Sequence, residues 1–250
     1  MRRQEDSWNI MNGSIQVIPI ARLMVAFVPV TIVMVVFYRW SMEGRTVVLA
    51  VGRMLIQLIL IGYVLVFIFE AKHPSMVVGV LSIMLAVAGW IAMRPLADRR
   101  TGLYPKALGA IALGGVSTLA LVTQVVLDLD PWFLPRYLVP LGGMIFANSM
   151  NCVSLAAERF ESEIKERASY PEARRIAFRA SLIPMVNSLF AVGIVSIPGM
   201  MTGQILSGVS PLLAARYQIV VMCMVFGSSG IASAVYLTWS RSAGSKVEPN

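Results

Sequence analysis

The polar side chains best able to do chemistry in this sequence lie inside long apolar stretches. Arg53 and Gln57 are four residues apart, so they share one face of a predicted helix. Polar groups in such stretches are costly in a bilayer and usually face the protein interior or a water-filled cavity. We therefore consider a gating or lipid-contact role for this pair. The alternative is that Arg53 extends to the cytoplasmic surface, one to two turns away.

Two further polar groups could line a path across the membrane. The members of the first group recur every three residues. The second group includes a proline-glycine break, which would free backbone carbonyls for a cation. The alternative for the first group is ordinary hydrogen bonding between helices, and the glycines of the second would also permit close helix packing or a re-entrant turn. Their members are Asn148, Asn151 and Ser154 in the first group, and Asn187, Ser188, Pro198, Gly199, Met200 and Met201 in the second.

Metal chemistry has few ligands available here. Sixteen methionines could favour a soft ion such as Cu(I), although methionine also fills apolar cores. His73 is the only histidine, and the predicted spans contain no Asp or Glu. We expect no catalytic residue and no cofactor bound by this chain, and the metal ligands stay unknown. An intramembrane enzyme is the least favoured interpretation, because the predicted spans lack the carboxylates and the His/Cys clusters that most catalytic sites use.

The elements that position these residues are membrane-spanning helices. The chain is 57% hydrophobic and only 14% charged, and its apolar runs reach the length of about 20 residues that crosses a bilayer. The predicted fold is an all-α, polytopic transmembrane bundle. Its seven expected spans cover roughly residues 15–38, 46–69, 76–93, 105–127, 136–157, 180–206 and 212–240. The sixth span is expected to be broken at Pro184 and at Pro198.

Charge placement predicts the orientation of these spans. Alternate connections, on one side, hold fourteen Lys and Arg residues, whereas those on the other side hold five. The positive-inside rule then puts the N-terminus outside and the C-terminus inside a plasma (inner) membrane. The net charge of +8 is explained in this way without a nucleic-acid partner. We expect one domain over residues 1–250, with a disordered tail at 241–250.

The longest hydrophilic segment, residues 158–181, is predicted to form two short cytoplasmic helices. Phe160, Ile164 and Ala168 recur every four residues on one face. Ser169 and Glu172 form an S-x-x-E capping box that starts the second helix. Such an ordered, amphipathic loop is suited to docking a soluble partner. The alternative is an ordinary solvated connector.

This loop, ending in "ASLIP", resembles the coupling loop of ATP-binding-cassette transporter permeases. The motifs "VGRMLIQLILIGYVLVFIF", "VPLGGMIFANSMN" and "VSIPGMMTGQILSGVSP" are similar to the iron-export permease family, which includes the plant aluminium-tolerance permeases. The resemblance implies a homodimeric permease that exports iron or another metal, driven by a cytoplasmic ATPase subunit that binds ATP and Mg. The coupling residues would then be Phe160, Glu161, Ile164, Arg167, Ala168, Ser169, Tyr170, Pro171, Glu172 and Ile176.

The chain departs from that family pattern at Arg167, where such loops commonly have glycine. The break between the two helices would then depend on Ser169 and Pro171. No G-x-x-x-x-G-K-[ST] phosphate loop occurs in the sequence, so a separate ATPase is expected. The alternatives are a membrane scaffold or sensor whose loop binds a non-ATPase partner, or a permease for a cargo other than a metal.

Overall fold

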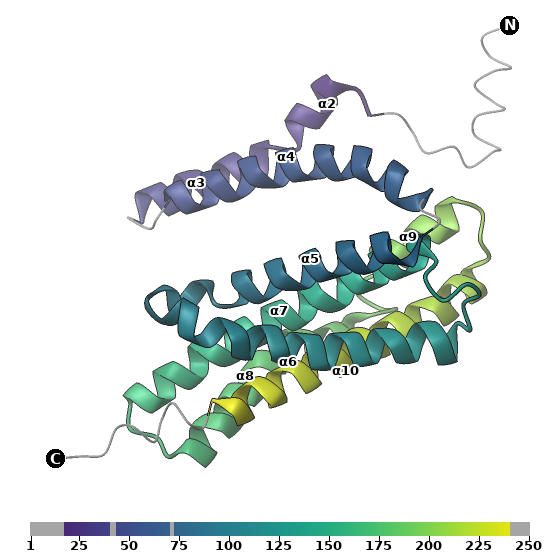
Figure 1. Ribbon diagram of the computed structural model, residues 1–250. Helices are drawn as coiled ribbons and strands as arrows, with labels where there is room; N and C mark the ends of the chain where they lie inside the picture. The colour runs from purple at the N-terminus through teal and green to yellow at the C-terminus, as the bar shows by residue number, and fades with distance from the viewer. Residues whose placement is uncertain (1–17, 41–43, 71–72, 241–250) are drawn as a thin grey trace, which may run out of the picture. The chain divides into compact units, whose positions relative to one another are not determined.

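The computed structural model describes residues 18–40, 44–70 and 73–240, and all regular secondary structure in these ranges is helical (Figure 1). The chain divides into two compact units. The first comprises Met1–Glu70 with Leu206–Gly208, and the second comprises Ala71–Ile205 with Val209–Asn250. The predicted tail at 241–250 lies outside the described residues. The expectation of a single domain stays a prediction.

Three helices lie in the described residues of the first unit. They are α2 (Ile20–Val25), α3 (Val28–Arg39) and α4 (Gly44–Phe69). The first predicted span is interrupted between α2 and α3, where Pro29 stands at the start of the new helix. Proline is tolerated there because the first amides of a helix have no intrahelical acceptor.

The second unit is a bundle of long helices with shorter segments between them (Figure 1). Helix α10 packs on α6, α7 and α8, α7 also packs on α6 and α8, and α5 packs on α6 and α7. The bounds in chain order are α5 (Pro74–Ala92), the 3-10 segment η1 (Arg94–Arg99), α6 (Arg100–Leu121), the π-helical segment η2 (Val122–Val126), α7 (Pro135–Lys165), α8 (Tyr170–Ala191), α9 (Gly199–Leu206) and α10 (Pro211–Trp239).

A glycine allows α6 and α10 to approach closely. A Cβ atom at Gly114 would lie 2.7 Å from the backbone oxygen of Ser228 and 2.8 Å from the nitrogen of Ala232. Small residues at such crossings are typical of membrane bundles, where association depends on van der Waals packing rather than on water exclusion. The neighbouring Gly115 accommodates the ring of Phe146 from α7 in the same way. The core is therefore built around the middle of α6.

Six helical segments among the described residues are long and apolar enough to cross a membrane, which confirms the polytopic helical fold. They match all the predicted spans except the sixth, residues 180–206, which is divided. Helix α8 continues through Pro184, so the predicted break at that proline is wrong. The interruption falls after Ala191, where Gly193 adopts a φ of 87° and Pro198 precedes α9.

The predicted pair of short helices at residues 158–181 is also corrected. Residues 158–165 are the last turns of α7, and residues 170–181 are the first half of α8. Only residues 166–169 connect them. The 31 residues of α7 span about 46 Å, so this helix is longer than a hydrocarbon core of about 30 Å. The charged segment is therefore the end of a helical hairpin that extends beyond the apolar region.

Candidate functional site

The tip of the α7–α8 hairpin is a compact helix terminus centred on Arg167. The amide of Arg167 donates to the carbonyl of Ile164 at 3.1 Å, and the amide of Ala168 donates to that of Glu163 at 3.0 Å. This pair of bonds is a Schellman motif, which needs a left-handed residue at the position of Arg167. Arg167 has a φ of 65°. The position at which the resembling family commonly has glycine is thus one where the backbone favours glycine.

Helix α8 begins where the S-x-x-E pattern predicted. Ser169 is its N-cap with extended backbone angles, and Pro171 lies in the first turn. The predicted capping-box bond is not made, because the Ser169 side chain forms no cap hydrogen bond. The chain therefore reverses at Arg167 and restarts at Ser169, and both features contribute to the break.

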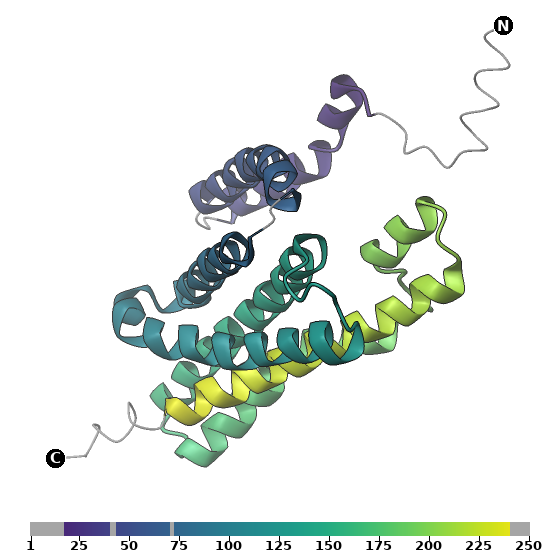
Figure 2. The same ribbon diagram turned by 45° about the vertical axis from the view of Figure 1, so that its right-hand side comes forward.

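Tyr170 ties this hairpin to the end of α10. Its hydroxyl donates to the carbonyl of Leu237 at 3.0 Å. Its ring meets the Phe160 ring edge to face, with centroids 5.9 Å apart. The Arg174 guanidinium lies 5.6 Å from the centroid of the Tyr170 ring. The ends of α7 and α10 and the start of α8 consequently lie together (Figure 2).

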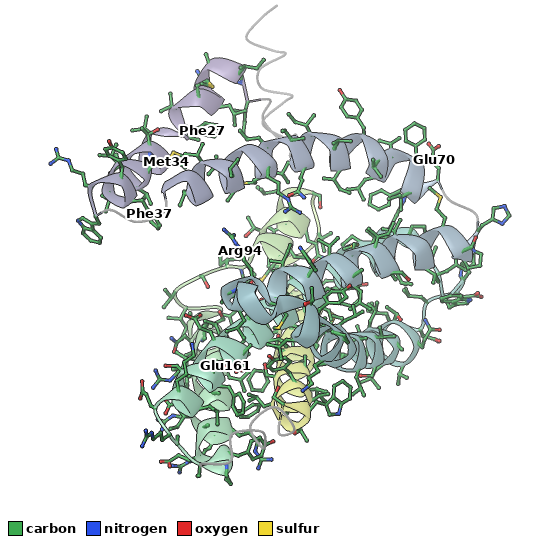
Figure 3. All side chains as sticks on the ribbon, turned by 60° about the vertical axis from the view of Figure 1, so that its left-hand side comes forward. Phe27, Met34, Phe37, Glu70, Arg94 and Glu161 are labelled. Atoms are coloured by element: carbon green, nitrogen blue, oxygen red, sulfur yellow. The ribbon has the colours of Figure 1, made fainter. Side chains whose placement is uncertain are left out.

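The predicted coupling residues divide into a buried and an exposed set. The apolar members pack against the bundle, with Phe160 only 3% exposed and Ile164 and Ala168 partly buried. The exposed members are Arg167, Ser169, Pro171 and Glu172, whereas Glu161, Tyr170 and Ile176 are half-buried. The predicted amphipathic face is real, but it packs on the protein's own core. Figure 3 shows side-chain nitrogen and oxygen atoms gathered at this end, where Glu161 is labelled.

An ion pair also stabilises the end of α7. Glu163 is 6% exposed, and its carboxylate accepts from the Arg159 guanidinium at 2.5 Å, one helical turn earlier. A buried carboxylate needs such a partner, because removing the charge from water is costly. The hairpin therefore combines a satisfied buried charge with an exposed polar tip.

The residues predicted to line a path are placed on several helices. Arg53 and Gln57 are exposed on α4, in the first unit. Asn148 and Ser154 are half-buried and Asn151 is exposed, all on α7. The Asn148 amide donates to the carbonyl of Met144 at 2.8 Å within its own helix. That bond does not bridge two helices.

The second predicted path group lies around the interruption between α8 and α9. Asn187 and Ser188 are exposed near the end of α8, and the Ser188 hydroxyl donates to the carbonyl of Pro184 at 3.0 Å. Gly199 starts α9 after Pro198, and Met200 packs against the core. Met201 is half-buried. These residues lie near one another because they are close in the sequence. Their role in transport stays a prediction.

A buried polar seam, a row of small polar side chains between α7 and α10, was not predicted from the sequence. Ser149 on α7 and Ser229 and Ser233 on α10 are fully buried. The hydroxyl oxygens of Ser149 and Ser233 make no hydrogen bond within the described part of the chain. The run "GSSGIAS" on α10 was the available signal, because small polar residues at this density are typical of a helix interface.

Within residues 18–40, 44–70 and 73–240, no three His, Cys, Asp or Glu side chains gather into a group that could hold a metal ion. His73 is exposed at the start of α5.

Comparison with known proteins shows that the chain is similar to one family of proteins and to several of its individual members. A family model described as "Uncharacterised protein family (UPF0014)" matches residues 20–243. The "UPF0014 membrane protein slr1647" of Synechocystis is 39% identical over 70% of this chain and 73% of its own. "Protein ALUMINUM SENSITIVE 3" of Arabidopsis thaliana is 32% identical over 80% and 77%. The "Probable iron export permease protein FetB" of Escherichia coli is 32% identical over 79% and 81%. No solved structure matches the chain.

Proposed function

The chain belongs to the UPF0014 family of multi-pass membrane proteins, and from that premise we propose that it is the permease subunit of an ATP-binding-cassette transporter. The observation that carries the proposal is the α7–α8 hairpin, an ordered polar tip on two helices that continue into the bundle. Such a tip offers a soluble ATPase a rigid docking element. In this proposal the transporter lies in the plasma membrane.

The exposed part of the hairpin is the proposed ATPase contact. Arg167, Ser169, Pro171 and Glu172 are exposed and lie within six residues of one another. They carry both signs of charge, which suits a specific polar interface with a partner. ATP and Mg would bind on that partner, since the 250 residues contain no P-loop sequence.

The buried part of the hairpin is the proposed route of force transmission. A displacement of the tip would move Tyr170, whose hydroxyl is bonded to Leu237 near the end of α10. The Phe160 ring couples the same movement to α7. Rigid helices joined in this way can convert docking at the tip into a shift of the bundle. Alternating access would then follow the ATPase cycle.

We propose a metal ion, with iron first, as the exported cargo. Two relatives carry names that refer to iron export and to aluminium sensitivity. A homodimer of this chain would bring the polar faces of α7 and α8 from two copies around one path. Asn148, Asn151 and the interruption between α8 and α9 supply uncharged oxygen donors, and Met200 and Met201 supply thioethers.

The decisive experiment separates partner, coupling and cargo. The first step is to search for an adjacent gene that encodes a soluble ATP-binding-cassette ATPase. The chain is then co-expressed with that ATPase, and their co-purification and the stimulation of ATPase activity in liposomes are measured. Uptake into inverted vesicles is measured for iron, aluminium, copper and organic solutes. We expect co-purification and ATP-dependent iron uptake. Retrieval of only non-ATPase partners would support a scaffold or sensor, and uptake restricted to an organic solute would replace the metal cargo.

A charge-reversal pair tests the docking surface itself. Glu172→Lys should weaken ATPase association, because Glu172 is exposed on the first turn of α8. Glu70→Lys is the matched control, since Glu70 is an exposed residue just after α4. Equal ATPase stimulation by both variants and the unaltered protein would contradict docking through the hairpin.

A further inference from the structure

A hollow of about 460 Å³ lies on the flank of the hairpin, between the start of α8 and the last turns of α10. Helix α8 contributes four of its residues and α10 contributes three. The lining is formed by Pro171, Arg174, Arg175, Phe178, Ala234, Leu237 and Thr238.

The lining combines an apolar surface with two cations. Pro171, Phe178 and Leu237 supply carbon surface, whereas Arg174 and Arg175 supply guanidinium groups from adjacent positions of α8. No acidic residue belongs to the lining. A ligand that satisfies both parts must be an amphiphile with an anionic head, because a small free anion would leave the apolar part unused.

Arg174 is held in place before any ligand arrives. Its guanidinium lies over the Tyr170 ring at 5.6 Å, and the hydroxyl of that ring is bonded to Leu237. Within the described residues, neither Arg174 nor Arg175 forms an ion pair with a carboxylate. Their hydrogen-bonding capacity therefore remains open to phosphate oxygens, which guanidinium groups bind with good geometry.

The hollow also lies at the end of the apolar part of α10, the level at which the head group of a lipid would be. Helix α10 is apolar to its end and finishes at Trp239, a residue type that concentrates at membrane interfaces. Arg179 follows Arg175 by one turn, so the cationic side of α8 extends toward the apolar half of the helix. Basic groups at this level are attracted to anionic lipids of the cytoplasmic leaflet.

We propose that this hollow binds one anionic phospholipid, with its phosphate between Arg174 and Arg175 and the beginning of its acyl chains against Phe178 and Leu237. The inference does not rest on the proposed transport function, because it uses only the membrane location and the lining. A soluble ATPase is the competing occupant. The exposed hairpin tip suits that partner better, since the hollow is formed with the membrane-spanning α10.

The test uses the full-length protein in detergent and native mass spectrometry with phosphatidylglycerol or phosphatidylcholine added. We expect phosphatidylglycerol adducts that survive competition by inorganic phosphate. The double variant Arg174→Gln/Arg175→Gln should lose roughly 30-fold in affinity, from about five-fold for each arginine at a membrane surface. The control Arg39→Gln/Arg216→Gln removes two exposed arginines elsewhere and should bind normally. Circular dichroism verifies that all variants are folded.

A conservative variant keeps the result interpretable. Arg174→Lys/Arg175→Lys retains both charges and should keep most of the adduct. Equal binding of the two lipids, or equal affinity of the double glutamine variant and its control, would overturn the proposal. Displacement of the lipid by inorganic phosphate would reduce the site to a simple anion site and would also overturn it. If the double glutamine variant binds lipid normally but no longer associates with the ATPase, the hollow is an ATPase contact and not a lipid site.

Discussion

The hydroxyl of Tyr170 at the start of α8 donates a 3.0 Å hydrogen bond to the carbonyl of Leu237, 67 residues later near the end of α10. The last carbonyls of a helix have no intrahelical donor, so this bond satisfies one of the groups that α10 leaves open. The same ring packs on Phe160 of α7. One side chain thus joins three helices at the end of the bundle that carries the candidate coupling element.

Replacing Tyr170 by Phe tests the contribution of this bond. The variant keeps the ring packing and loses only the donor, so we expect a loss of about 1 kcal/mol in the free energy of unfolding. Thermal unfolding of the detergent-solubilised protein measures the change. Tyr137→Phe is the control, because Tyr137 is 39% exposed and should tolerate the same deletion. Equal behaviour of the two variants would mean that the hydroxyl of Tyr170 contributes nothing to stability.

Replacing Arg167 by glycine should stabilise the hairpin. Arg167 has a φ of 65°, a conformation that costs a residue with a side chain roughly 1 kcal/mol and glycine almost nothing. We expect a small rise in the unfolding midpoint. Arg216→Gly in α10 is the opposite control, since glycine inside a helix costs about 1 kcal/mol. A fall in the midpoint for both variants would show that the turn does not limit stability.

Replacing Gly114 by alanine should force α6 and α10 apart. The new Cβ would lie 2.7 Å from a backbone oxygen, and a backbone atom cannot move aside as a flexible side chain can. We expect destabilisation of about 1–3 kcal/mol, the usual range for an overpacked core. Gly79→Ala is the matched control, because a Cβ atom there would meet no neighbouring side chain or packed helix within 4 Å and alanine favours a helix. A neutral Gly114→Ala variant would contradict the close crossing.

Replacing Ser233 by alanine should leave stability unchanged or increase it. Its hydroxyl is fully buried and makes no hydrogen bond with any described residue, so the deletion removes an unsatisfied polar group. Ser228→Ala is the comparison, because the Ser228 hydroxyl donates to the carbonyl of Val225 at 3.2 Å. We expect that variant to lose up to about 1 kcal/mol in chemical unfolding experiments. A larger loss for Ser233→Ala would reveal a partner in the buried seam.

Much of the fold could be predicted because apolar length is a local property of the sequence. The second predicted span, residues 46–69, corresponds closely to α4, and the last, residues 212–240, corresponds to α10. The break inside the sixth span was expected at both Pro184 and Pro198, and only the second location was correct. A proline can remain in a helix when other groups compensate for the missing amide, and those groups are not visible in the sequence.

The candidate site was predictable only in part. The pattern from Phe160 to Glu172 correctly indicated an amphipathic segment and a helix start at Ser169. It wrongly separated the segment from α7 and α8, because charged residues were taken to end the membrane helices. A helix can continue beyond the bilayer as long as its inner face is packed, and Phe160 and Ala173 are both buried.

The sequence by itself determined that this is a helical membrane protein, on which side its positive charges gather and which family it belongs to, because these properties depend on composition and local order. Only the tertiary structure decided that Tyr170 meets Leu237, that Gly114 lets α6 touch α10 and that Arg174 and Arg175 border a hollow with Phe178. These contacts join residues far apart in the chain. They follow from how the helices pack, which local patterns do not encode.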